Sequence, residues 1–90
     1  CPVAPIVLDL GSEVGELARV CRDAFSDWRR TLREGFLRAG IAEARAASLA
    51  VTVVSAIEGA LLIARADRST EPLETIAGEL GTLIDGAFAR

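Results

Sequence analysis

Residues 55–66 read SAIEGALLIARA, and they lie within a longer apolar run, Leu49–Ala64. Only three residues of that run are polar, namely Thr52, Ser55 and Glu58. A helix that is apolar on nearly all sides is buried on several of them. The run therefore predicts a central helix over 41–66 that needs more than two neighbours, and this requirement decides the fold.

Two amphipathic helices flank the central one. Ser12 is a suitable N-cap, and apolar residues then recur at every third or fourth position up to a stop at Gly40. Thr70 can cap the last helix, with Pro72 in its first turn and an apolar stripe running to about residue 89. The leader, residues 1–10, contains two prolines and predicts a short helical turn. We therefore expect an all-α fold, in which a short leader helix precedes three longer helices.

The composition indicates one small domain, residues 1–90, with apolar surface to spare. Hydrophobic residues make up 51% of the chain, and the mean hydropathy is +0.37. Such a surplus in a short chain suggests surface meant for a partner. The net charge is −3 and no basic block occurs, so the chain lacks the electrostatic footprint of a nucleic-acid binder.

The sequence offers little for catalysis or metal binding. It has no histidine and no lysine, and its cysteines, Cys1 and Cys21, are far apart. A nucleophile–base pair and a metal site both need groups that are missing here. We expect no enzymatic activity and no metal or cofactor. Cys21 lies on the apolar face of its helix and is expected to be an inert, buried thiol.

A membrane span is also disfavoured. The run Leu49–Ala64 is shorter than the roughly 20 residues that a span needs. Glu58 near a bilayer centre would cost on the order of 3 kcal/mol. We therefore expect a cytoplasmic protein that does not associate with a membrane.

Three segments together resemble the C-terminal domain of TetR-family transcriptional regulators, most closely the branch that includes the lincomycin-resistance repressor. They are CPV at 1–3, AFSDW at 24–28 and SAIEGALLIARADRSTEPLE at 55–74. The resemblance covers essentially the whole chain, and AIEGALLIARA is its most specific part. It implies a homodimer in which the last two helices form a four-helix bundle with a second copy. It also implies a small effector, bound by the helices ahead of them, that releases operator DNA from the full protein. The helix-turn-helix that binds DNA, and the first helices of the effector domain, would lie outside these 90 residues.

The central helix points to the same dimer, because a second copy supplies the neighbours it lacks. Its small residues Ser48, Thr52, Ser55 and Gly59 form a seam that allows another backbone to approach closely. We expect a dimer interface that includes Ser55, Gly59, Leu62, Leu80, Leu83 and Ile84.

The candidate effector contacts are Phe25, Trp28, Leu32, Val54 and Glu58. Core packing is the simpler interpretation of the aromatic stripe, and an ion pair to an arginine of a neighbouring helix is the simpler interpretation of Glu58. The resemblance implies a small apolar or amphipathic effector. The alternative function is a free-standing helical interaction module without a ligand, which a solid core at these residues would favour.

Overall fold

The computed structural model describes residues 15–88, which form three helices and no strand. They are α2 (Gly15–Arg38), α3 (Glu43–Asp67) and α4 (Glu71–Phe88). The predicted all-α class is confirmed for this part of the chain. The expected leader helix and the Ser12 cap lie outside the described residues.

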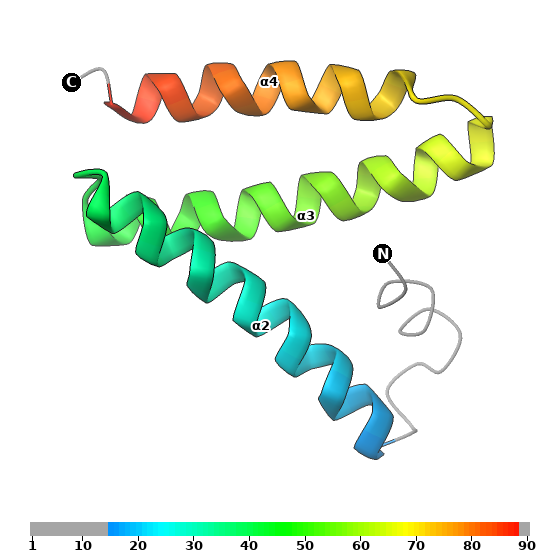
Figure 1. The fold of residues 1–90 in the computed structure, drawn as a ribbon, viewed down its shortest axis with the longest axis horizontal. Coiled ribbons are helices and arrows are strands. Elements are labelled where there is room, and N and C mark those ends of the chain that lie inside the picture. Colours follow the sequence, from blue (N-terminus) through cyan, green and yellow to red (C-terminus); the bar gives the residue numbers. More distant parts are fainter. Residues whose placement is uncertain (1–14, 89–90) are drawn as a thin grey trace.

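The helices form a single layer. Helix α3 lies in the middle, α4 runs antiparallel along one side of it, and α2 diverges from its other side (Figure 1). The Cα atoms extend over 43 × 31 × 13 Å, so the shortest dimension is close to the diameter of one helix. Stable domains normally bury their apolar faces between at least two packed layers. Among residues 15–88, no second layer of helices therefore covers the broad sides of α3.

The core is small and lies where all three helices meet. It centres on Ile41, Ala46 and Leu49, against which residues of α2 and α4 pack: Phe36, Leu37, Leu83 and Ala87. Leu49 is the largest fully buried side chain. Helix α4 contributes no buried residue, although it is apolar along one stripe. Cys21 is buried, as the sequence predicts.

Helices α2 and α3 end in the same hydrogen-bonded turn. After α2, the amide of Ile41 donates to the carbonyl of Phe36, and the amide of Gly40 donates to the carbonyl of Leu37. This Schellman pattern requires a left-handed residue, and Gly40 has a φ of 100°. The prediction that Gly40 ends the helix is confirmed.

At the end of α3 the left-handed residue is Arg68, with φ 54° and ψ 45°. The amide of Ser69 donates to the carbonyl of Ala64, and the amide of Arg68 donates to that of Arg65. A side chain with a Cβ is strained in this conformation. Because this position is not a glycine, the sequence does not predict a left-handed residue here.

The start of α4 differs in detail from the prediction. Thr70 precedes the helix and Pro72 lies in its first turn, as expected. The capping hydroxyl, however, belongs to Ser69, whose Oγ accepts the amide of Glu71 at 3.1 Å. The hydroxyl of Thr70 instead donates to the carboxylate of Glu74 at 3.2 Å. The helix amide is therefore satisfied by the Ser69 hydroxyl, and the Thr70 hydroxyl does not make the predicted capping bond.

Candidate functional site

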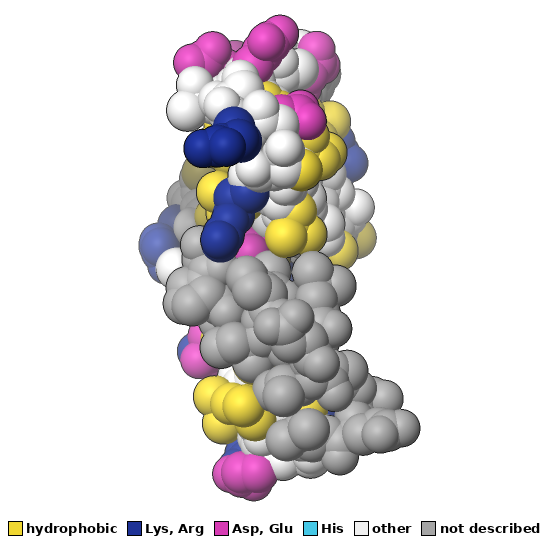
Figure 2. All heavy atoms as spheres, turned by 90° about the vertical axis from the view of Figure 1, so that its right-hand side faces the viewer, with side chains coloured by type: hydrophobic (Ala, Val, Ile, Leu, Met, Phe, Trp, Pro, Cys, Tyr) yellow, Lys and Arg dark blue, Asp and Glu magenta, His cyan; other side chains and the backbone are white. Residues whose placement is uncertain are grey.

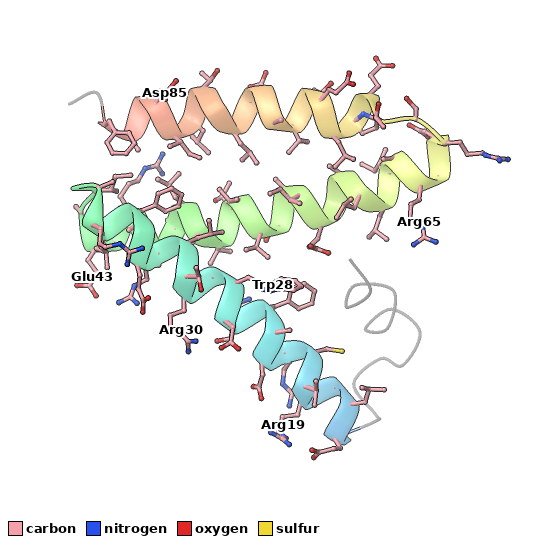
Figure 3. The ribbon with its side chains drawn as sticks, viewed as in Figure 1. Arg19, Trp28, Arg30, Glu43, Arg65 and Asp85 are labelled. Atoms are coloured by element: carbon pink, nitrogen blue, oxygen red, sulfur yellow. The ribbon has the colours of Figure 1, made fainter. Side chains whose placement is uncertain are left out.

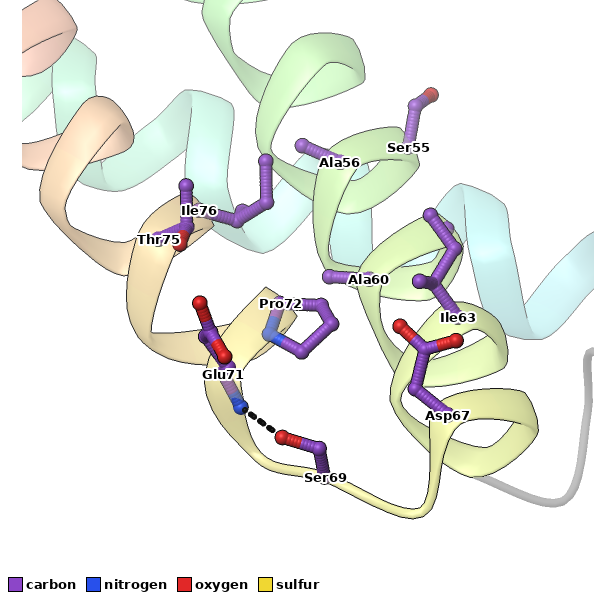
Figure 4. Close-up of a pocket in the computed structure, with 11 residues that line it drawn as sticks. Ser55, Ala56, Ala60, Ile63, Asp67, Ser69, Glu71, Pro72, Thr75 and Ile76 are labelled. Carbon is purple, nitrogen blue, oxygen red and sulfur yellow. Dashed lines mark hydrogen bonds between the residues drawn. The ribbon is translucent and has the colours of Figure 1, made fainter.

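A groove runs between α3 and α4 near the turn that joins them (Figure 4). We call it the α3–α4 groove, and its volume is about 630 Å³. It is lined by Ser55, Ala56, Gly59, Ala60, Ile63, Asp67, Ser69, Glu71, Pro72, Thr75 and Ile76. Small residues of α3 form one wall, so the groove exists because that helix has little bulk at this position.

The predicted small-residue seam opens into this groove. Ser55 and Gly59 both line it, and a Cβ placed at Gly59 would meet no heavy atom within 4 Å. Glycine in a helix interior costs about 1 kcal/mol relative to alanine. No close contact within the described part of the chain requires a glycine at position 59. Ile63, one turn further along, is 54% exposed.

Exposed apolar side chains are common along all three helices. Large ones that stay exposed are Leu17, Val20, Trp28, Val51, Ile57, Leu62, Ile63 and Phe88. Figure 2 looks onto the turn between α3 and α4 and shows separate groups of exposed hydrophobic side chains among acidic and arginine side chains. Exposed apolar side chains in this number suggest a surface that binds a partner.

The other residues expected at the dimer interface have mixed surroundings. Leu80 and Ile84 are half-buried on α4, and Leu62 is exposed but lines neither the groove nor the wedge described below. Leu83 packs against the small core of its own chain. It therefore has less surface left for a partner than the spacing of the apolar stripe suggests.

A second depression lies between α2 and α3, where the two helices begin to diverge. We call it the wedge; it has a volume of about 260 Å³ and is lined by Phe25, Arg29, Val54, Ser55 and Glu58. Three of the five predicted effector contacts, Phe25, Val54 and Glu58, are thus brought together. Arg29 and Ser55 were not among the predicted contacts.

Trp28 and Leu32 do not line the wedge. Trp28 packs edge-on against Phe25, with ring centroids 5.4 Å apart and an interplanar angle of 87°. It lies in the opening between α2 and α3 and remains 38% exposed (Figure 3). Leu32 is half-buried closer to the core. The aromatic pair therefore borders the wedge, whereas Leu32 belongs to the packing between the helices.

Glu58 has an unusual environment. Its Oε1 atom is buried and has no hydrogen-bond partner among the described residues. The ion pair with an arginine that the sequence suggested is not formed within this part of the chain, where the ion pairs involve other residues. Arg29 lines the same depression without reaching ion-pair distance. A buried acceptor without a partner costs about 1–3 kcal/mol, and more when it is charged.

Most ion pairs among the described residues lie on the exposed side of α2. Arg19 pairs with Glu16 and Asp23, and Arg30 pairs with Asp27. Arg19 and Arg30 point away from α3 in Figure 3. Arg33 instead reaches Glu43 at 3.2 Å and ties α2 to the start of α3. Exposed pairs of this kind contribute about 0–1 kcal/mol each, so they add little to the stability of the fold.

Residues 15–88 contain no group of three or more His, Cys, Asp or Glu side chains placed to hold a metal ion. Helix α3 has 25 residues. Its most apolar stretch has a mean hydropathy of 2.0, and 28% of that stretch is buried. By length and composition the whole helix could cross a membrane, whereas the run Leu49–Ala64 alone is too short to do so. A single helix of this kind is weak evidence, because core helices of soluble proteins have the same properties.

Comparison with known proteins identifies relatives among transcriptional regulators. Residues 1–79 match the family model of the C-terminal domain of LmrA/YxaF-like transcriptional regulators. Two uncharacterized HTH-type transcriptional regulators of Mycobacterium tuberculosis, MT0206 and Rv0196, are each 34% identical over 89 residues. The alignments cover 93% of this chain but only 46% of each relative, so the chain spans about half of their length. No solved structure matches the chain with significance.

Proposed function

Because this chain belongs to the TetR-type family of LmrA/YxaF-like C-terminal domains of transcriptional regulators, we propose that it is the dimerisation and effector-sensing part of such a regulator. The resemblance inferred from the sequence is confirmed at the level of the family. The dimer, the effector and the coupling to operator DNA are our proposals. DNA would be bound by a part of the regulator that precedes these residues, in the cytoplasm.

The dimer proposal is supported mainly by the α3–α4 groove, which lies open on a structure with only one layer of described helices. Ser55 and Gly59 leave room there for a second backbone, and Ile63 offers an exposed apolar side chain. A second copy related by a two-fold axis would place the same groove opposite itself and supply the missing layer. Such an interface should bury at least the roughly 1,200 Å² of specific complexes.

The effector would bind in and around the wedge. Phe25, Val54 and Glu58 line it, and Trp28 borders it; Leu32 supports α2 from the core side. An effector that favours one angle between α2 and α3 would shift the population of dimer shapes, and with it the spacing of two DNA-binding domains. The domain would act by binding alone, without catalysis or a cofactor.

Ile63→Glu tests the proposed interface. In the dimer the new carboxylate would be buried against the second copy without a partner, which costs several kcal/mol. Val20→Glu on α2 is the matched control, because Val20 is 51% exposed and Ile63 is 54% exposed. We expect sedimentation velocity at micromolar concentration to show a monomer for Ile63→Glu and a dimer for Val20→Glu.

Two results would contradict the proposal. If Ile63→Glu sediments as a dimer like the unmodified chain, the α3–α4 groove is not the interface. If Val20→Glu dissociates the dimer and Ile63→Glu does not, the chain associates through α2. Circular dichroism of both variants establishes that they retain the helices.

A further inference from the structure

Two half-buried charged residues of opposite sign, Glu58 and Arg29, line the wedge. Glu58 comes from α3, and its Oε1 atom is buried without a hydrogen-bond partner in the described part of the chain. Arg29 comes from α2 and also lines a neighbouring depression between α2 and α3, together with Arg30, Arg33 and small residues of α3. Arg29 thus lies between two depressions, and Oε1 of Glu58 has no hydrogen-bond donor among the described residues.

The remaining walls of the wedge are suited to an apolar body. Phe25 and Val54 line it, and the ring of Trp28 stands edge-on to Phe25. Aromatic faces attract cations, and carboxylates form their strongest hydrogen bonds with charged donors. The volume of about 260 Å³ is slightly below the usual range for drug-sized ligands, so the ligand must be small.

From these observations we infer that the wedge binds small aromatic or apolar molecules that carry one cationic group, with Glu58 as the counter-ion. This inference rests on the proposed effector-sensing function and adds the chemical class of the effector. The cationic group pairs with the carboxylate of Glu58, and the apolar body lies against Phe25 and Val54. Ligands with a carboxylate in the same place are excluded, because their charge would face that of Glu58.

Three probes of the same shape test the inference: phenylbutylamine, phenylbutanol and phenylbutyrate. Trp28 is the one tryptophan of the chain, so its fluorescence reports binding at the wedge. A hydrogen bond with a charged partner contributes about 1 kcal/mol more than a neutral one, which corresponds to roughly five- to tenfold in affinity. At neutral pH we expect phenylbutylamine to bind about five- to tenfold more tightly than phenylbutanol, and phenylbutyrate to bind most weakly.

Glu58→Gln should reverse this order. The substitution keeps the size of the side chain and leaves Arg29 as the charged group of the wedge, so phenylbutyrate should bind more tightly than phenylbutylamine. Glu79→Gln removes the same charge from an exposed position on α4 and should keep the preference for the amine. The control separates recognition at the wedge from attraction to the net negative charge of the chain.

The inference is overturned if Glu58→Gln still prefers the amine, or if the unmodified chain binds all three probes equally. Equal binding would leave the effector-sensing function standing, because the wedge would then be an apolar site without charge selectivity. If no probe changes the fluorescence of Trp28 while the chain sediments as a dimer, the inference and the sensing function both fail. Dimerisation would be unaffected by that result.

Discussion

Gly59→Ala should act in opposite directions on a monomer and on a dimer. Alanine is the best helix former and glycine among the poorest, with a difference of about 0.8–1.0 kcal/mol in a helix interior. Gly59 lies in the interior of α3, and a Cβ placed there meets no heavy atom within 4 Å. Within one chain the substitution therefore has a benefit and no steric cost.

In the proposed dimer the same methyl group enters the contact between two backbones, once from each copy. Overpacking of a close contact costs about 1–3 kcal/mol. The propensity gain is the same in the separated folded chains and in the dimer, so only the overpacking by the two methyl groups changes the dissociation constant. We expect the dissociation constant of the dimer to rise by about tenfold or more, since each 1.4 kcal/mol is a factor of ten.

Gly35→Ala on α2 is the matched control. The nearest atom to a Cβ at Gly35 is Nη2 of Arg38 at 3.9 Å, which is an ordinary contact with a flexible side chain. A gain of about 1 kcal/mol should raise the melting temperature by about 4–8 °C without changing the dissociation constant. Thermal denaturation at several protein concentrations, with sedimentation velocity, measures both quantities. If Gly59→Ala stabilises the chain as much as Gly35→Ala does and leaves the dimer unchanged, Gly59 does not lie at a crossing between copies.

Three further predictions follow from the core, the turn and the charge of the chain. Leu49→Ala should lower the free energy of unfolding by about 2–5 kcal/mol in urea denaturation, because Leu49 is 1% exposed; a loss under about 1 kcal/mol would place the core elsewhere. Arg68→Gly should raise stability by roughly 0.5–1 kcal/mol by relieving the left-handed backbone at φ 54°, whereas Arg68→Ala should not; equal effects would show that the side chain matters and the backbone does not. This chain by itself should not bind operator DNA specifically in fluorescence anisotropy, and salt-dependent specific binding would contradict the separation of functions.

The helices and most of their ends could be predicted from the sequence. Apolar spacing identifies α2 and α4, and the long apolar run identifies α3; Gly40 and Pro72 mark ends because their backbone requirements are specific. Arg68 takes a left-handed conformation that its residue type does not announce. The ion pair between Arg33 and Glu43 could not be predicted either, because it depends on how α2 crosses α3.

The candidate site could be predicted only in part, for the same reason. Periodicity shows which face of a helix is apolar, but not how far along the helix a neighbour stays in contact. Helix α2 diverges from α3, so Phe25 lines the wedge while Leu32, on the same face, packs closer to the core. Arg29 lies beside the apolar arc and was missed. Leu83 packs against the core of its own chain, and its contact with a partner stays a prediction, because a stripe on α4 looks the same whether it packs on its own chain or on another.

Sedimentation equilibrium of the unmodified chain at micromolar concentration tests the central claim most directly. A single layer of helices with an open α3–α4 groove should associate into a species of twice the 9.5 kDa of one chain. Its melting temperature should rise with protein concentration, as for any fold stabilised by association. A helical, cooperatively unfolding monomer of 9.5 kDa at this concentration would contradict the account.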